Sequence, residues 1–426
     1  MLISSDSTNN GAYGLLTSTY KRGFTVLVAT GLALNFFLLW SDWRELQQGY
    51  ADFTIFYSAA GIVRSGRGAD LYSEQAQWQA QLASAPGVNI RHGALPYNHP
   101  PFEALLFVPF TLLPYFSAYL EWNMLNAVML AVVIWLVRRR SEQLRRVRWA
   151  LPLLIALSFF PVFMCLFQGQ DVILLLLVMT SAYALLKDGS DFEGGIALGL
   201  GLFRPQLVLP LALLVLCMRR TRRFAGGFVL SSVAVAALSI AVVGWHSFIT
   251  YPSYVWRIER ALGNGAIVPA NMPNLRGLSS FLHEGSLSAF IVTGLSSIVL
   301  FTYAAQVLRS CERGLTLELS FAIAILATLL VSYHLLIYDL ALLFLPILFV
   351  YEECIGFSNG PLAAIKRWAV IGPIAFMFCT PLLMLLWLSA GKFNLVALVL
   401  LVWFWGLVRA SPRPAAQRNE MLAAQN

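Results

Sequence analysis

Long apolar segments, separated by short polar ones, recur along the whole chain of 426 residues. A helix needs about 20 apolar residues to cross the hydrocarbon core of a bilayer. The pattern therefore predicts an all-α polytopic membrane protein of about twelve helices, forming one membrane domain over residues 22–409. The twelve apolar segments are 23–41, 116–137, 149–167, 171–186, 192–204, 206–218, 224–245, 286–308, 315–334, 338–351, 368–389 and 394–408.

Two stretches do not fit a plain membrane span. The apolar run 192–218 contains Arg204 next to Pro205. An interior proline breaks a helix, so this run is either two short helices or a re-entrant pair. FEALLFVPFTLL (102–113) is too short to cross, and a full crossing would reverse the orientation of every later helix. We therefore expect it to lie in the membrane interface or to re-enter.

Basic residues set the orientation, because lysine and arginine are retained on the cytoplasmic side of membrane proteins. With the polar tails 1–21 and 410–426 placed inside, the inner side holds most of the 29 lysines and arginines. The two long segments 42–115 and 246–285 then lie outside. All five histidines fall in these outer segments or at the outer end of a helix, so we expect the chemistry on the outer face.

Composition supports this class and excludes others. The chain is 58% hydrophobic and only 12% charged, whereas soluble domains carry about 25% charged residues. The net charge of +8 does not indicate nucleic-acid binding, because the basic residues cluster at the ends of predicted membrane helices, where cytoplasmic retention explains them. The cysteines have no metal spacing, and we find no phosphate loop, dinucleotide fingerprint, zinc motif or nucleophile elbow. No cofactor, metal ion or nucleic-acid partner is expected.

Asp52 begins an otherwise apolar stretch, YADFTIFYSAAGIV (50–63). Apolar residues from Phe53 to Val63 recur at helical spacing, which predicts a short helix over 51–64 lying in the membrane interface. Asp52 would lie in its first turn, where the helix dipole favours a negative charge. The acid is either a helix-end charge or a general base at the membrane surface.

Three further polar groups interrupt apolar sequence. Arg204, within FRPQ, is an intramembrane charge, which is expensive in lipid and therefore a functional candidate. A guanidinium of this kind suits a phosphate. His99 lies within the proline-rich stretch PYNHPPF, which we expect to form a rigid segment at the membrane surface. Its side chain either only supports that segment or faces a site. Asp171, within QGQD, is either a helix-end acid in a tight turn or a site residue.

Two later stretches carry charged residues near the predicted outer surface. Arg276 lies in NMPNLRGL, whose Asn, Pro and Gly content indicates a loop, and it either pairs with lipid headgroups or serves a site. His334 and Asp339 lie five residues apart in SYHLLIYDLALLFLP. They are either a helix-capping pair or part of the same site.

Taken in order, these stretches resemble glycosyltransferase family 87. The similarity covers roughly residues 22–350 and includes DFxxFYxAAxxxxxGxxxxLY (Asp52 to Tyr72), YNHPPF followed by FVPFTLLPY, GQD, the FRPQ break, NLRGL and SYHxxxYDLALLFLP. This family is a bacterial branch of the GT-C membrane glycosyltransferases, and it includes mannosyltransferases that depend on polyprenol-phosphate-mannose.

The resemblance implies a GT-C bundle whose long first outer loop carries interfacial helices. It implies inverting transfer of a hexose, with mannose favoured, from a polyprenyl-phosphate sugar to a lipid or cell-envelope glycan. The reaction would occur at the outer face of a bacterial plasma membrane. Asp52 falls on the family's general base and His334 on a second catalytic position. Where the family often has lysine before Pro-Gln, this chain has Arg204, which keeps the charge but changes its geometry.

The resemblance and the intramembrane charges together define a set of candidate site residues. The donor phosphate is assigned to Arg64, Arg204 and Arg276, and the other candidates are Tyr57, His99, Gln170, Asp171, Gln206, Asn274 and Asp339.

Two other functions remain open at this point. A multi-pass transporter or lipid flippase would use Arg204 and Asp339 to line a pathway, but no inverted repeat is visible and the first outer segment is unusually long for a transporter. A non-catalytic assembly scaffold would not depend on Asp52. Sugar transfer from a lipid-linked donor distinguishes the transferase from both.

Overall fold

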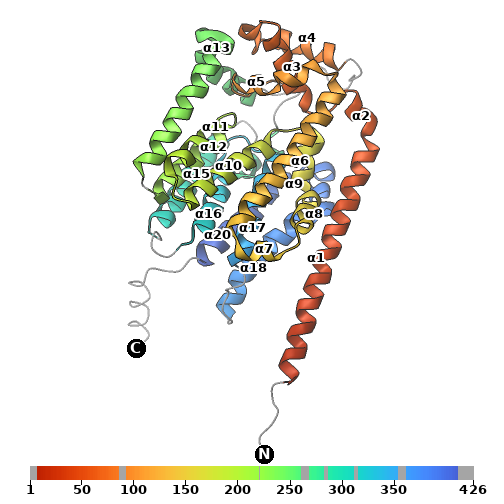
Figure 1. Cartoon of the computed structure of the whole chain (residues 1–426), viewed down its shortest axis with the longest axis vertical. Coiled ribbons are helices and arrows are strands. Elements are labelled where there is room, and N and C mark those ends of the chain that lie inside the picture. The colour runs from red at the N-terminus through yellow and green to blue at the C-terminus, as the bar shows by residue number, and fades with distance from the viewer. Residues whose placement is uncertain are drawn as a thin grey trace, which may run out of the picture.

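The computed structural model describes residues 7–85, 93–219, 221–260, 268–282, 286–310, 315–353 and 361–410. Within these ranges the chain folds into helices joined by short connections, with no strand (Figure 1). Several of the helices are apolar and long enough to cross a bilayer. The predicted class, an all-α membrane protein, is therefore confirmed.

Fewer helices qualify as membrane spans, by length and composition, than the sequence predicts. In the described part of the chain, five helices are long and apolar enough to cross a membrane, or up to seven if each of two bent pairs is one span. The count of about twelve is not confirmed. The five are the Arg22–Ser41 part of α1 (Ser7–Ser41), α6 (Tyr115–Arg140), α13 (Arg222–Arg260), α15 (Leu287–Ser310) and Phe393–Ala410, which comprises η8 (Phe393–Leu395) and α20 (Val396–Ala410). The bent pairs are α8 (Ala150–Ser158) with α9 (Phe160–Gln168), at 75°, and α18 (Pro361–Met377) with α19 (Thr380–Met384) and η7 (Leu385–Ser389), at 70°.

The other apolar segments form shorter helices, and burial explains their composition. In α16, every residue from Glu318 to Leu330 is buried. A helix that is hydrophobic all round belongs to a protein core or to a membrane span, and hydropathy alone does not distinguish the two. The shorter helices are α10 (Val172–Lys187), α11 (Asp191–Leu200), α12 (Pro205–Arg219), α16 (Leu317–Val331), η5 (Ile337–Leu343) and α17 (Phe344–Glu353).

The predicted break at Arg204-Pro205 is present, because α11 ends at Leu200 and α12 begins at Pro205. Short helices gather at one end of the bundle, where α3, α4 and α5 lie together at the top of Figure 1. The predicted helix 51–64 is α3, and FEALLFVPFTLL folds as α5 and η2, two short pieces packed against α3. The elements of this end are α2 (Trp43–Gln47), α3 (Phe53–Arg64), η1 (Gly68–Asp70), α4 (Glu74–Ser84), α5 (Glu103–Phe107) and η2 (Val108–Leu112).

The predicted second outer loop, 246–285, is partly helical. Gly244 has non-helical dihedral angles (φ 78°, ψ 164°) that favour glycine, so it divides α13 at a kink into two helical parts, and the second part runs to Arg260. Three short elements follow, namely η3 (Pro269–Asn271), α14 (Leu275–Ser279) and η4 (Ser280–Leu282). The arginine-rich end of α6 and the short α7 (Glu142–Arg146) lie toward the other end of the bundle (Figure 1).

Helices α11 and α13 pack backbone against backbone. A Cβ atom on Gly195 would lie 2.1 Å from the Phe224 carbonyl oxygen, and one on Gly227 would lie 1.9 Å from the Phe192 carbonyl oxygen. Small residues one helical turn apart let membrane helices approach this closely. These glycines therefore allow α11 and α13 to lie in close contact.

We expect Gly227→Ala to destabilise the protein by roughly 1–3 kcal/mol, because overpacking forces the two backbones apart. The measurement is the thermal unfolding temperature of purified protein in detergent. Gly226→Ala is the matched control, since its Cβ would meet nothing closer than Phe192 Cε2 at 3.7 Å. Equal unfolding temperatures for the two variants would contradict the close-packing interpretation.

Candidate active site

A cavity of about 740 Å³ lies where the short helices meet the bundle. Its wall is assembled from α3, the segment 95–99, the turn between α9 and α10, the start of α12, α13 and the segment 333–338. These elements come from separate parts of the chain. Six residues predicted from the sequence line this one cavity, namely Asp52, His99, Gln170, Arg204, Gln206 and His334.

Asp52 occupies the N-cap position of α3, but its side chain does not cap the helix. The carboxylate Oδ2 instead accepts a hydrogen bond from Gln170 Nε2 at 2.9 Å. The backbone N–H of Asp52 donates to Gln168 Oε1, also at 2.9 Å. The sequence placed the acid within the first turn, whereas the structure uses it as a half-buried group on the cavity wall.

Gly169 allows the turn between α9 and α10 to reach Asp52. Its φ of 63° is a left-handed conformation that ends α9, and a Cβ there would lie 2.8 Å from Phe53 Cβ. Trp122 Nε1 donates to the Gly169 carbonyl oxygen at 3.0 Å and fixes the turn from the other side. Gln168 and Gln170 flank this glycine, so both amides are aimed back at one residue.

Arg204 lies directly behind Gln170 and is only 2% exposed. Its Nη2 donates to Gln170 Oε1 at 2.7 Å, and its Nε donates to Asp171 Oδ1 at 2.8 Å. Its Nη1 donates to Asp339 Oδ1 at 2.7 Å. A buried guanidinium must be paired in this way. Arg204 thus orients the side-chain amide of Gln170, which in turn donates a hydrogen bond to Asp52.

A second group of charged residues lies at the same cavity. His334 Nδ1 lies 2.7 Å from Glu259 Oε1, and Arg276 pairs with the other oxygen of that carboxylate. Arg276 also stacks on Tyr333, with 3.9 Å between its guanidinium carbon and the ring centroid. Glu259, Tyr333 and His334 line the cavity, whereas Arg276 supports them from behind.

Three residues predicted for the site lie outside the cavity wall and stabilise local structure instead. Tyr57 Oη donates to the Leu113 carbonyl oxygen at 2.8 Å, and the exposed Arg64 donates to the Thr111 carbonyl oxygen at 2.8 Å. Asn274 caps α14, since its Oδ1 accepts the Gly277 N–H at 2.9 Å. None of the three is among the residues that line the cavity.

Three residues of this region were not predicted from the sequence, namely Gln168, Glu259 and Glu103. Gln168 lies two residues before Gln170 in the same QGQD motif. Treating both glutamines of the motif as candidates would therefore have included it. Glu259 lies in WRIER, beside two arginines that made it resemble a surface acid. Glu103 follows the YNHPPF motif directly and is fully buried.

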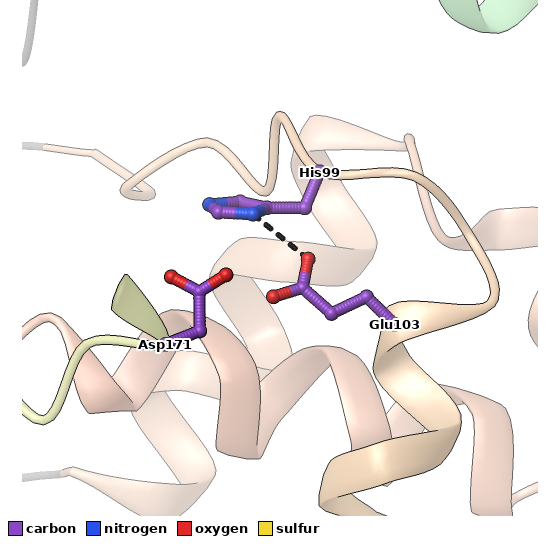
Figure 2. Close-up of side chains that lie close together, drawn as sticks. All are labelled: His99, Glu103 and Asp171. Carbon is purple, nitrogen blue, oxygen red and sulfur yellow. Dashed lines mark ion pairs between the residues drawn. The ribbon is translucent and has the colours of Figure 1, made fainter. Parts of the chain in front are cut away.

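His99, Glu103 and Asp171 bring potential metal ligands together. One ligand atom from each residue lies within 4.8 Å of the other two (Figure 2). Burial lowers the pKa of His99 to about 3, so the imidazole is neutral at ordinary pH. The sequence carried no metal spacing because the third ligand is separated from the first two by 68 residues in the chain.

An all-helical membrane protein with a polar, carboxylate-bearing cavity at one end of its bundle fits a membrane transferase that works beside the lipid. A family model of glycosyltransferase family 87 matches residues 97–332, more than half of the chain, and the chain belongs to that family. No curated protein and no solved structure matches it. The protein is therefore a glycosyltransferase. Asp52 precedes the matched region, so its role rests on the cavity geometry.

Proposed function

We propose that the protein transfers a hexose, with mannose favoured, from a polyprenyl-phosphate sugar to a hydroxyl group of a lipid or cell-envelope glycan. One observation carries this proposal: the Asp52 carboxylate is held by Gln170 in a cavity that Arg204 and His334 also line. A family of glycosyltransferases supplies the reaction class.

The chemistry needs a base and a way to stabilise the leaving phosphate. As the acceptor oxygen bonds to the anomeric carbon, Asp52 takes the hydroxyl proton, and the bond from that carbon to the phosphate oxygen breaks. Attack from the side opposite the phosphate inverts the anomeric centre. Arg204 and His334 line the cavity and Arg276 supports it through Glu259, so these side chains are placed to stabilise the charge that develops on the phosphate.

Apolar side chains on the cavity wall suit the lipid part of such a donor. Ile55, Leu95, Met164 and Trp387 line the cavity together with the polar groups. An isoprenoid chain gains free energy by leaving water for a surface of this kind. A nucleotide sugar would instead require recognition of a base and a ribose, for which the sequence carries no motif.

The placement of charge supports an outward-facing site in a bacterial plasma membrane. Helix α6 begins at Tyr115, beside the short helices near the cavity, and its 26 residues end at Arg138, Arg139 and Arg140. At about 1.5 Å per residue the helix spans roughly 39 Å, about one membrane thickness. Because arginines are retained in the cytoplasm, the cavity belongs on the opposite face.

The donor test uses purified protein in proteoliposomes with a panel of polyprenyl-phosphate sugars and envelope lipid acceptors. We expect a glycosylated lipid by mass spectrometry with a polyprenyl-phosphate hexose, strongest with mannose, and none with nucleotide sugars. Product from a nucleotide sugar alone would overturn the lipid-linked donor. Movement of the donor across the bilayer without any glycosidic product would favour a flippase.

A further inference from the structure

His99, Glu103 and Asp171 form a cluster that the transfer reaction does not use. His99 and Glu103 come from the segment that leads into α5, and Asp171 comes from the turn before α10. Figure 2 shows the imidazole above two carboxyl groups that face each other. We propose that these three side chains bind one divalent cation, of a kind that accepts mixed nitrogen and carboxylate ligands, such as Mn²⁺ or Zn²⁺.

Unpartnered buried oxygens are the first argument. Glu103 and Asp171 are both 0% exposed. In the described part of the chain, no N–H or hydroxyl group donates to either carboxyl oxygen of Glu103 or to Oδ2 of Asp171. These oxygens have only each other, and the two carboxyl groups form a hydrogen bond only when one of them is protonated. His99 Nδ1 lies 2.8 Å from Glu103 Oε2, but the imidazole is neutral and the two groups are not aligned for a hydrogen bond. Buried polar atoms are nearly always satisfied, so these oxygens indicate an absent partner.

Charge balance is the second argument. Glu103, Asp171 and Asp339 are fully buried carboxyl groups in one connected network, and Arg204 is the buried guanidinium that pairs with two of them. Three acids thus share one guanidinium, so the network contains two more acidic groups than cations. Buried uncompensated charge is costly, and one divalent cation would balance the two remaining acids when they are ionised.

A proton shared by Glu103 and Asp171 is the competing arrangement. Burial, followed by the charge of Asp171, raises the pKa of Glu103, which favours a proton on that group. One shared proton would form a single hydrogen bond between one oxygen of Glu103 and one oxygen of Asp171. It would still leave the second oxygen of Glu103 unpartnered and one negative charge uncompensated.

The ligand atoms suit an ion in type and spacing. Mn²⁺ and Zn²⁺ accept imidazole nitrogen and carboxylate oxygen at about 2.0–2.2 Å, so ligands on one ion lie roughly 3–4 Å apart. The three atoms lie within 4.8 Å of one another. His99 also lines the cavity, so the ion would lie just behind the cavity wall and tie the α5 segment to the turn that carries Gln170. This inference does not depend on which donor the enzyme uses.

The test measures the ion itself. Full-length protein, purified without a histidine tag, is stripped with a chelator, and Mn²⁺ binding is followed by electron paramagnetic resonance and Zn²⁺ content by mass spectrometry. We expect about one ion per chain and a higher unfolding temperature in its presence. Glu103→Gln is expected to weaken binding at least tenfold. Glu318→Gln changes a buried acid that is paired with Lys187 and Tyr183 instead, so it should bind the ion normally.

Two results would overturn the metal site. Stripped wild-type protein that binds neither ion, with an unfolding temperature unchanged by either, would assign the cluster to a shared proton. Glu103→Gln imitates a protonated carboxyl group, so a variant that binds as many ions as wild type, equally tightly, would place the ion elsewhere. Because His99 is partly exposed, His99→Ala provides a second ligand variant if Glu103→Gln does not fold, and unchanged binding there would also contradict the proposal.

Discussion

Replacing Asp52 by asparagine is expected to lower the rate of sugar transfer by about 10² to 10⁴ while leaving the fold intact. Asparagine keeps the shape of the side chain and can still accept the hydrogen bond from Gln170. Its amide cannot take the proton of the acceptor hydroxyl. The measurement is the initial rate of glycolipid formation at saturating donor, with the unfolding temperature recorded on the same preparation.

Asp70→Asn is the matched control for this variant. Asp70 lies in the same predicted outer segment, but its carboxylate pairs with Arg67 and its side chain is 49% exposed. We expect wild-type turnover from it. If Asp52→Asn also retained wild-type turnover, Asp52 would not be the base. The membership of the family would stand, because the family match begins after this residue.

Local patterns predicted some of the short elements near the cavity and failed for another. The Asn, Pro and Gly content of NMPNLRGL indicated a loop, whereas Leu275–Ser279 forms helix α14. The apolar spacing after Asp52 predicted a helix over 51–64, and α3 spans Phe53–Arg64. The proline next to Arg204 predicted the break between α11 and α12. Both signals act within one or two helical turns, where backbone geometry and side-chain periodicity determine the structure.

The number of spans could not be obtained in the same way. Hydropathy measures how apolar a segment is, but it does not say whether lipid or protein covers it. Helix α16 is apolar because it is buried in the bundle on all sides. Its 15 residues are fewer than a span needs. Counting each such segment as a crossing gave about twelve spans, against five to seven long helices in the described part.

The site could be predicted residue by residue but not as a network. The sequence indicated Arg204 as an expensive intramembrane charge, yet its partners Asp171 and Asp339 are 33 and 135 residues away along the chain. The contact between Gln170 and Asp52 joins residues 118 positions apart. No local spacing encodes such pairs. Only the fold therefore shows which acid faces the cavity and which acids neutralise an arginine.

Arg204→Gln is expected to be the most damaging single change in the cavity wall. Removing the guanidinium leaves Asp171 and Asp339 buried without the cation that pairs with both. Breaking a buried ion pair from one side costs about 3–5 kcal/mol, so we expect a large fall in unfolding temperature and in yield. Arg67→Ala, which removes an exposed ion pair, should cost less than about 1 kcal/mol.

Loss of folding would hide the catalytic role of Arg204, so the charge must be balanced in a second variant. Combining Arg204→Gln with Asp171→Asn and Asp339→Asn removes the buried charges together, and neutral hydrogen bonds can replace them. We expect most of the lost stability to return. Measured against the Asp171→Asn single variant, which loses the same proposed ion ligand, the triple variant should still turn over at least tenfold more slowly, because Gln170 loses the donor that orients it toward Asp52.

The kinetic constants of the triple variant separate the two roles of Arg204. Binding of the donor phosphate by the guanidinium predicts a raised KM for the polyprenyl-phosphate sugar, whereas positioning of Asp52 through Gln170 predicts a lowered kcat. We expect both changes, since Arg204 lines the cavity and also holds Gln170. An unchanged donor KM would remove the phosphate role, and an unchanged kcat would show that Asp52 does not need this chain of hydrogen bonds.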